Sequence, residues 1–508
     1  MTSIIIIGSG MGGLAAGIYG QLNGFQTRIF EAHSLPGGQC TSWKRKGYVF
    51  DGCIHHFGAG SGKTKMDAFW REVGAMPAEM ASTTAVVSVR FPDGACFHDY
   101  YDLEKLRTHL LELSPQDAPV IEEYLHGIRL FLQSDVIGAL YLGSLREKLA
   151  VLPRLPGLWR YLTSTLGDFA RRFEHPGLRQ AFALLHSSVP QFPLFLHLAK
   201  HATVLQGDLA WPRGGSITIA RNMVTRYKQL GGSLHTNQKV VKILVKHDRA
   251  CGVELADGTR HFADFVISNA DGRKTILQML DGRYLDPKIA SYCQPNPDNT
   301  VPFAVQVFLG VKRDLAGLPA GLVLFLDQPA EIAGGTCQHL DVQLYGFDPS
   351  MAPAGKGVMK VELFARASYF ERLQADPAAY QAEKNRIAEQ VITLLDKAFP
   401  GLRADVEVVD VTTLRTWEHF MGGTGGHHNF PNKPFLIIRE ALGLNPCNRL
   451  PGLKNFSLVG QWATSAGSLF MNAYSGKTAV QNICRQCGVK FTTHPHKENL
   501  RCQNTSLA

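Results

Sequence analysis

The stretch Ser3-Ile-Ile-Ile-Ile-Gly-Ser-Gly-Met-Gly-Gly-Leu14 decides the fold class of this 508-residue chain. Ile4 to Ile7 is a short run of β-branched apolar residues, which is typical of a buried parallel strand. The glycines that follow, Gly8, Gly10 and Gly13, have the spacing G-x-G-x-x-G, and small and apolar residues then recur at helical spacing. A strand, a glycine-rich turn and a helix in this order predict a Rossmann-like α/β domain that binds a dinucleotide.

Each glycine has its own task in such a turn. Gly8 lets the strand turn sharply, Gly10 lets the backbone approach a pyrophosphate, and Gly13 lets the helix pack on the sheet. The helix N-terminus offers N–H groups to the phosphates. Glu31 follows a second predicted strand, about 20 residues after the first glycine, where a ribose hydroxyl needs an acceptor. This context favours a dinucleotide site over the alternative, a tight strand–helix turn without a ligand.

Composition narrows the range of partners. The chain is too long for one ordinary core, so at least two domains are expected. The net charge of +9 favours acidic partners such as phosphate cofactors or anionic lipid, but no long Lys/Arg run points to nucleic acid. The 10 cysteines are scattered, which is typical of reduced thiols in an intracellular protein. Cys484 and Cys487 have no second pair at zinc spacing, so we expect ordinary thiols and no metal site.

The sequence predicts a cytoplasmic protein and leaves contact with a membrane surface open. The first strand begins at Ser3, which leaves no room for a signal peptide, and no stretch is long and apolar enough to span a bilayer. The segment 136–166 is rich in Leu, Tyr and Trp and carries interleaved Arg and Lys residues. One interpretation is a set of helices that cover a deep apolar pocket, and the other is an amphipathic surface that enters lipid. The pocket interpretation is favoured. Both can hold.

Three further stretches point to the same class of protein as the N-terminal stretch. They are Pro36-Gly-Gly38; Pro212-Arg-Gly-Gly-Ser216 with Val266-Ile-Ser-Asn-Ala-Asp271; and Val459-Gly-Gln-Trp462 with Gly467-Ser-Leu469. Their order and spacing resemble the phytoene desaturase branch of the FAD-dependent amine-oxidase-like enzymes, over nearly the whole chain. That branch includes carotenoid desaturases, carotenoid cis–trans isomerases and retinol saturases. The resemblance implies noncovalent FAD, because no cysteine lies at an obvious flavin-attachment position.

The resemblance also implies a set of cofactor-binding residues: Gly8, Gly10, Gly12, Gly13, Glu31, Gly38, Gln39, Val240, Gly460, Gln461, Ser468 and Leu469. The N-terminal glycines would hold the FAD pyrophosphate and Glu31 the adenosine ribose. Gly38 and Gln39 would lie along the diphosphate, and Val240 would meet the adenine through its backbone. The last four residues would lie near the ribityl chain and the flavin. Many relatives carry Arg at the position of Gln39 and Asp at that of Gln461, but an amide still hydrogen-bonds a ribityl hydroxyl.

The expected architecture is α/β, with a Rossmann-like FAD-binding domain that is discontinuous in sequence. Residues 1–70, 206–275 and 451–490 would form that domain. Residues 71–205 would form a helical insertion facing substrate or membrane. Residues 276–450 would form an α+β substrate domain with a mixed sheet, and residues 491–508 a disordered tail.

The resemblance implies an FAD-dependent oxidoreductase that acts on a hydrophobic polyene or isoprenoid, by hydride transfer between a substrate C–H or C=C and flavin N5. His55 and His56 lie where relatives bring the backbone to the flavin, so either is a candidate acid or base, or a packed histidine. One alternative is a redox-neutral carotenoid isomerase that uses reduced FAD. Another is a binding protein similar to Rab GDP-dissociation inhibitors, which the intact FAD motifs disfavour. Only one dinucleotide fingerprint occurs, so oxygen or a quinone is the expected electron acceptor.

Overall fold

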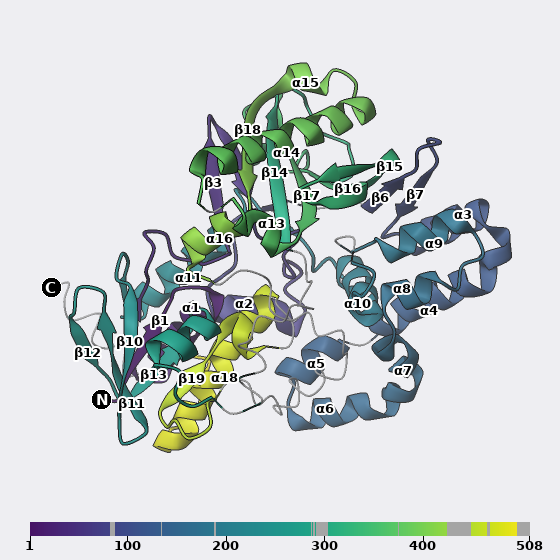
Figure 1. Ribbon diagram of the computed structural model, residues 1–508. Helices are drawn as coiled ribbons and strands as arrows, with labels where there is room; N and C mark the ends of the chain where they lie inside the picture. Colours follow the sequence, from purple (N-terminus) through teal and green to yellow (C-terminus); the bar gives the residue numbers. More distant parts are fainter. Residues whose placement is uncertain are drawn as a thin grey trace.

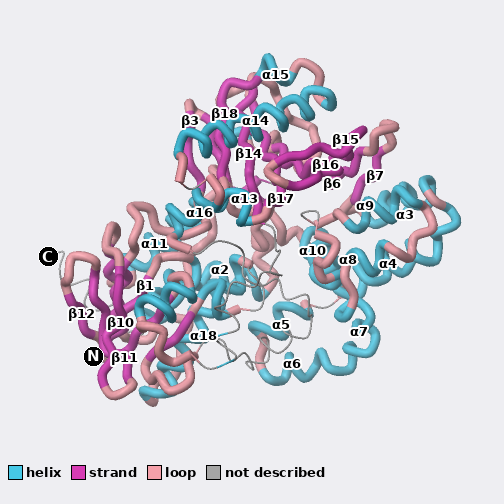
Figure 2. Tube along the Cα trace, in the orientation of Figure 1, coloured by secondary structure: helices cyan, strands magenta, loops and turns pink. Residues whose placement is uncertain are grey.

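The computed structural model describes residues 1–81, 87–133, 135–186, 189–285, 287, 290, 303–373, 375–423, 449–464 and 468–494. Figure 1 shows a small parallel sheet with the N-terminus beside it, a larger sheet above it, and a separate group of helices to the right. Figure 2 shows the same division, with strands gathered in the first two parts and helices alone in most of the third. The predicted α/β class with a Rossmann-like domain is confirmed.

The parallel sheet collects strands from both ends and the middle of the chain. Its order is β19-β13-β1-β2-β9, and every neighbouring pair is parallel. The strands are β1 (Ser3–Ile7), β2 (Gln26–Phe30), β9 (Ser233–His235), β13 (Phe265–Ser268) and β19 (Phe456–Leu458). The sheet therefore exists only when three distant segments come together.

The run Ile4–Ile7 is apolar throughout because both faces of the sheet are covered. Ile4 and Ile6 belong to the core that contains the helices α1 and α18, whereas Ile5 and Ile7 pack with residues of an antiparallel sheet. Since successive side chains of a strand point to opposite faces, a strand buried on both sides loses its polar alternation. The covering elements are α1 (Met11–Leu22), α11 (Ile217–Gln229), α18 (Leu469–Cys487), β10 (Val240–Lys246), β11 (Arg249–Leu255) and β12 (Arg260–Phe262).

The larger sheet has the order β18-β14-β17-β16-β15-β6-β7. It is antiparallel except where β6 pairs with β15. Its strands are β6 (Val87–Arg90), β7 (Cys96–Asp99), β14 (Phe303–Val311), β15 (Gly321–Ile332), β16 (Gly335–Leu344), β17 (Gly357–Ala365) and β18 (Val406–Thr412). The long helix α14 (Pro377–Ala398) packs its apolar stripe into the core of this sheet. The expected helical insertion from residue 71 thus also contributes two strands, β6 and β7, to this sheet.

A group of helices follows β7 in the chain and packs as its own layer (Figure 1). Its members are α3 (Leu103–Leu113), α4 (Ala118–Leu132), α5 (Val136–Leu142), α6 (Leu145–Val151), α7 (Leu155–Thr163), α8 (Leu166–Ala170), α9 (Pro176–Ala183) and α10 (Leu194–Leu205). Within the described residues, no helix combines the length and the apolarity that crossing a bilayer requires.

Further elements lie within or between these three parts. They are β3 (Ser42–Arg45), β4 (Tyr48–Asp51), β5 (Met80–Ala81), β8 (Trp211–Pro212), α2 (Lys65–Glu72), α13 (Ala367–Glu371), α15 (Leu402–Asp405) and α16 (Leu414–Met421), with a π-helical turn at Lys274–Met279 and a 3₁₀ turn at Gly460–Ala463. Of the expected tail, the Phe491 ring packs against Tyr19 in a tilted arrangement with ring centroids 5.7 Å apart, and Thr492 is hydrogen-bonded to Asn23. Residues 495–508 and Gly467 lie outside the described residues.

Candidate functional site

The turn between β1 and α1 lies at the carboxyl edge of the parallel sheet, where open α/β sheets bind their ligands. Gly8 has a φ of +87°, which favours glycine. A Cβ atom on Gly13 would lie 2.1 Å from the carbonyl oxygen of Gly8, so the helix starts too close to the strand for any side chain. Gly10 precedes α1 and gives no side-chain cap. The first-turn N–H groups therefore have no side-chain cap from Gly10 that would compete with an anion.

The segment Gly37–Gly38 runs alongside this turn. Gly37 N donates to Ser9 O at 3.0 Å, and Gly10 and Gly37 form a parallel bridge. Gly38 has a φ of +60°, and a Cβ there would lie 3.3 Å from the Cα of Gly10. The backbone of the second glycine pair is thus held against the first, and Gln39 beside it is exposed.

Glu31 is fixed at the end of β2 by three hydrogen bonds. Its Oε2 accepts from the backbone N (2.7 Å) and the Oγ (2.6 Å) of Ser9, and its Oε1 accepts from the backbone N of His33 (2.9 Å). A carboxylate has about four acceptor positions, so it can still accept a hydroxyl. Gln238 N donates to Glu31 O at 2.8 Å, which brings Val240, the first residue of β10, to the same side.

The C-terminal motif meets the N-terminal one at a glycine–glycine contact. A Cβ on Gly12 would lie 2.8 Å from Gly460 N and 2.9 Å from Asn472 O. Gly460 has a φ of +80°, and its N donates to Ser475 Oγ at 2.7 Å, which ties it to α18. Gln461 is partly buried in the turn that follows. Distant ends of the chain therefore converge at the start of α1.

Helix α18 begins directly after Ser468. Ser468 is its N-cap, and the Ser468 Oγ accepts from Met471 N at 3.1 Å. Ser468 is exposed, and Leu469, the first helical residue, is partly buried. The hydroxyl is already used as a cap, so its acceptor capacity toward a ligand is reduced.

Asn269 lies where the N-terminal and C-terminal glycine motifs meet. It is not among the site residues that the sequence predicts. A Cβ on Gly10 would lie 2.5 Å from its Nδ2, and one on Gly460 would lie 2.4 Å from its Oδ1. Its backbone N donates to Ile7 O at 2.8 Å, directly after β13. Asn269 belongs to the stretch Val266–Asp271, which carries part of the family resemblance. The sequence gives no reason to choose the asparagine from that stretch.

His55 and His56 lie on the loop after β4, which a buried carboxylate holds in place. Asp51 Oδ1 accepts from the backbone N of Cys53 (3.0 Å) and of Ile54 (3.2 Å). Its Oδ2 accepts from Ser42 Oγ at 2.6 Å and from Ser216 N at 2.5 Å. Asp51 therefore joins the loop to the start of α11.

The two histidines line a cavity between the loop, the larger sheet and the helical layer. The helical side contributes Leu184, Leu185, His186 and Lys200, and the sheet contributes Leu322, Val323 and Tyr345 among others. Both apolar and titratable side chains line this space. The structure thus brings His55 and His56 together in a cavity, and the glycines and Glu31 together at the edge of the parallel sheet.

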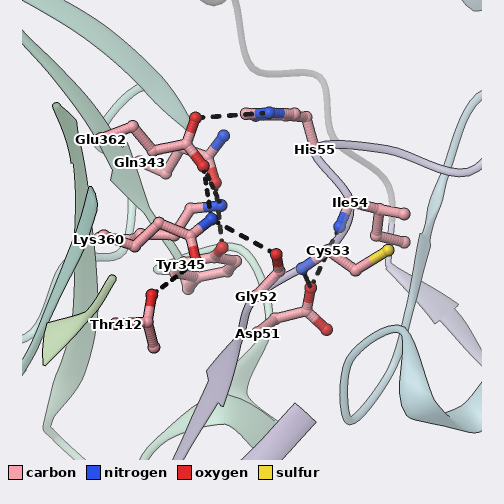
Figure 3. Close-up of polar contacts among 11 residues, drawn as sticks. Asp51, Gly52, Cys53, Ile54, His55, Gln343, Tyr345, Lys360, Glu362 and Thr412 are labelled. Carbon is pink, nitrogen blue, oxygen red and sulfur yellow. Dashed lines mark hydrogen bonds and ion pairs between the residues drawn. The ribbon is translucent and has the colours of Figure 1, made fainter. Parts of the chain in front are cut away.

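A buried charged cluster on the larger sheet touches His55 (Figure 3). Glu362 Oε2 lies 3.8 Å from His55 Nε2, and Glu362 Oε1 lies 3.0 Å from Lys360 Nζ. Gln306 Nε2 donates to Glu362 Oε1 at 2.9 Å and to Gly52 O at 3.3 Å. The cluster therefore connects the sheet directly to the loop that carries the histidines.

The surroundings set the charge of each member. Desolvation by the cavity wall lowers the pKa of His55 to about 4, against the opposing effect of Glu362, although 35% of its side chain is exposed. Desolvation also lowers the pKa of His56. Burial by itself raises the pKa of Glu362, but Lys360 and His55 outweigh it and bring the pKa to about 2. Burial opposes the charge on Lys360, but Glu362 more than offsets it, so its pKa lies above the ordinary value. At neutral pH the histidines are neutral beside a buried ion pair.

Sequence reasoning missed Glu362 and Lys360, although a signal exists. They stand at alternate positions of the otherwise apolar run Gly357–Ala365 and so point to one face of β17. Two charges in a strand buried throughout indicate a paired site. Their partners, such as His55 and Gln306, lie in distant segments of the chain, so the strand sequence does not predict them.

Comparison with known proteins identifies the class. The model of the flavin-containing amine oxidoreductase family matches residues 11–484, so the chain belongs to that family. It is 25% identical over 474 residues to a phytoene desaturase (lycopene-forming) of Paracoccus sp., covering 90% of this chain and 92% of that protein. It is 24% identical over 507 residues to prolycopene isomerase 1 of an Oncidium hybrid cultivar, covering 96% and 84%.

Solved structures agree on the fold. A putrescine oxidase variant superposes with a TM-score of 0.60 at 14% identity, covering 96% of this chain and 99% of that one. An oxidoreductase from Methanosarcina mazei gives a TM-score of 0.58 at 18% identity, covering 94% and 100%. The protein is thus an FAD-dependent oxidoreductase, and its relatives include phytoene desaturases and prolycopene isomerases. The uncapped start of α1 and the fixed Glu31 carboxylate fit the phosphates and a ribose of FAD.

Proposed function

We propose that this protein transfers a hydride between FAD and a hydrophobic polyene or isoprenoid, and so desaturates or saturates it. The observation that carries the proposal is the match to phytoene desaturases over 90% of the chain. Leu184, Leu185, Leu322 and Val323 line part of the cavity beside His55, whose volume of about 80 Å³ holds a short part of a polyene, and give that part apolar contacts.

We further propose how the chain holds the cofactor, without a covalent bond. Gly8, Gly10, Gly12 and Gly13 hold the pyrophosphate through backbone N–H groups, with Gly38 and Gln39 alongside. Glu31 binds the adenosine ribose, and Val240 meets the adenine. Gly460, Gln461, Ser468 and Leu469 lie along the ribityl chain and the flavin. The bound FAD supplies a hydride acceptor or donor at N5.

The protein's own residues would bind the polyene and manage charge around it. Apolar side chains of the cavity exclude water from the reacting carbons. His55 is neutral near pH 7 and accepts a proton, and the Glu362 carboxylate next to it stabilises the imidazolium that results. His56 lines the same cavity and is the second candidate for that role.

A second candidate function is a redox-neutral cis–trans isomerisation that needs reduced FAD. The observation that favours it is the match to prolycopene isomerases over 96% of the chain. The same cavity and cofactor site serve both reactions. The two differ in whether substrate and flavin change redox state.

The deciding experiment uses purified, flavin-loaded protein without oxygen. Phytoene, or a longer polyene, is supplied in detergent or liposomes while the visible flavin absorption and the polyene products are followed. Bleaching of oxidised flavin together with loss of two hydrogens from the polyene supports desaturation. Isomers of unchanged mass, formed only after dithionite reduction, support isomerisation.

No change of any tested polyene in either flavin state would overturn both candidate functions. A flavin-free preparation is the control, and added oxygen or a quinone identifies the electron acceptor.

We also propose that helices α6 and α7 rest on a membrane surface that supplies the apolar substrate. Leu145, Leu149 and Trp159 are exposed by 73%, 53% and 59%. Arg146 and Arg154 are exposed on the same two-helix segment. Large apolar side chains beside arginines suit the interface of an anionic bilayer.

A further inference from the structure

A second cluster of titratable side chains lies inside the helical layer, apart from the cofactor site. It consists of Asp99 at the end of β7, Tyr124 on α4, and His197 and His201 on α10. All four are at most 2% exposed. The two histidines are four positions apart on one helix, so they present their rings to the same side.

The donor atoms of the four side chains converge on one point. His201 Nε2 lies 3.0 Å from both carboxylate oxygens of Asp99, and His197 Nε2 lies 3.8 Å from Asp99 Oδ2. Tyr124 Oη lies 2.7 Å from His197 Nε2, 3.2 Å from His201 Nε2 and 3.4 Å from Asp99 Oδ1. A tetrahedral zinc ion with bonds of about 2.0–2.2 Å separates its ligand atoms by roughly 3.3–3.5 Å. The observed separations bracket that spacing.

The rings are oriented toward this point and not toward other partners. Within the described part of the chain, the Nδ1 atoms of His197 and His201 are buried and have no hydrogen-bond partner. Both histidines thus direct their Nε2 atoms toward the Asp99 carboxylate and the Tyr124 hydroxyl. The ion pairs of the Asp99 carboxylate among the described residues are with these two histidines. A buried carboxylate is costly unless a cation or several hydrogen bonds balance it.

We propose that Asp99, Tyr124, His197 and His201 form a tetrahedral binding site for a divalent zinc ion. Two imidazoles and a carboxylate are donors that zinc accepts, and the Tyr124 oxygen lies close enough to be the fourth donor. Two histidines and one carboxylate with open positions suit iron oxygenases, but Tyr124 fills the fourth position here. A closed set of four protein ligands is typical of a structural site.

The ion would join β7 of the larger sheet to α4 and α10 of the helical layer. Lys200 lies between the two histidines in sequence and lines the cavity beside His55. A zinc ion at this place would therefore fix the helix that presents Lys200 to the cavity. The inference does not depend on the nature of the substrate.

The test uses the full-length, flavin-loaded protein. After dialysis against a chelator, Zn²⁺ is added, the protein is desalted, and metal per chain is measured by mass spectrometry. We expect one zinc ion per wild-type chain and a higher melting temperature with Zn²⁺ than without it. His197→Gln combined with His201→Gln should lose that ion, and Tyr124→Phe should weaken binding about tenfold or more. His109→Gln, a histidine of α3 outside the cluster, should retain it.

Two outcomes would overturn the proposal. One is wild-type protein that retains no zinc; the other is retention of equal zinc by the double variant, which would place the ion elsewhere. Should the double variant fail to fold, wild-type protein loaded with Co²⁺ decides. A tetrahedral cobalt site absorbs in the visible beyond the flavin bands, and its absence there would contradict the assigned geometry.

Discussion

Glu362 Oε2 lies 3.8 Å from His55 Nε2, although the two residues belong to different parts of the chain. Glu362 is on the larger sheet, and His55 is on the loop after β4. The contact gives a neutral histidine a buried carboxylate neighbour, and Lys360 on the same strand balances that carboxylate. The carboxylate beside His55 is therefore held in place by residues of two distant segments of the chain.

Replacing Glu362 by Gln should destabilise the protein strongly. The change leaves the Lys360 ammonium buried without its counter-ion, and breaking one partner of a buried pair costs about 3–5 kcal/mol. Urea unfolding at pH 7 measures the loss. The combined variant Lys360→Met and Glu362→Gln should recover much of it, because no unpaired charge remains. Equal stability of wild type and Glu362→Gln would show that the pair is not formed.

The same pair predicts a pH dependence. The pKa of Glu362 in the folded protein is lowered to about 2 from an ordinary value of 4.5, so its contribution to stability is complete above pH 4.5. That contribution is lost as the pH falls toward 2, since the unfolded state binds the proton first. Unfolding free energies of wild type and Glu362→Gln should thus converge as the pH is lowered from 5 toward 2. A constant difference across this range would contradict the prediction.

His55 predicts loss of stability in a higher pH range. Its pKa in the folded protein is about 4 against an ordinary 6.5, so between these values the unfolded state binds more protons. Its contribution is complete above pH 6.5 and declines as the pH falls toward 4. His55→Gln should therefore lose less stability than wild type between pH 7 and 5, measured by thermal unfolding. Parallel curves for the two proteins would contradict the shift.

Gly12→Ala should separate the two ends of the chain and reduce flavin content. The new Cβ would lie within 3 Å of the backbone at Gly460 and Asn472, which cannot yield as a flexible side chain does. Overpacking of this kind costs about 1–3 kcal/mol. Flavin per chain and urea unfolding measure the effect. Gly157→Ala is the matched control, because it lies in α7 with nothing within 4 Å of the added Cβ and should be neutral or stabilising. Full flavin content in Gly12→Ala would oppose the predicted close contact.

Glu31→Gln should weaken FAD binding about 10- to 100-fold, because hydrogen bonds to a charged acceptor contribute roughly 1.5–3 kcal/mol. The carboxylate also orders Ser9 next to the glycine turn. Fluorescence titration of flavin-free protein with FAD measures the affinity. Glu104→Gln, at an exposed surface ion pair, is the control and should leave it unchanged. Unchanged affinity in Glu31→Gln would remove Glu31 from the cofactor site.

Replacing Leu145, Leu149 and Trp159 together by Ser should reduce binding to vesicles that contain anionic lipid. The three side chains are exposed, so their loss leaves the core intact. Co-sedimentation with vesicles measures binding. Phe262→Ser, which removes an exposed ring from β12, is the control. Equal binding of the triple variant and wild type would exclude α6 and α7 as the docking face.

The sequence by itself determined the parts whose signal is local. The run Ile4–Ile7, the glycine spacing and Glu31 predicted the strand, the turn and the nucleotide edge, because each glycine answers a short-range steric demand. The N-cap of α18 at Ser468 is a signal of the same local kind, because an N-cap acts within one turn.

Only the tertiary structure decided which distant residues face one another. The strands β6 and β7 join the larger sheet, Glu362 faces His55, and Asp99 meets His197, through contacts whose partners are far apart in sequence. The physical reason is that buried charges and buried polar groups depend on partners supplied by the fold, whereas periodicity and turn chemistry depend on neighbours in the chain.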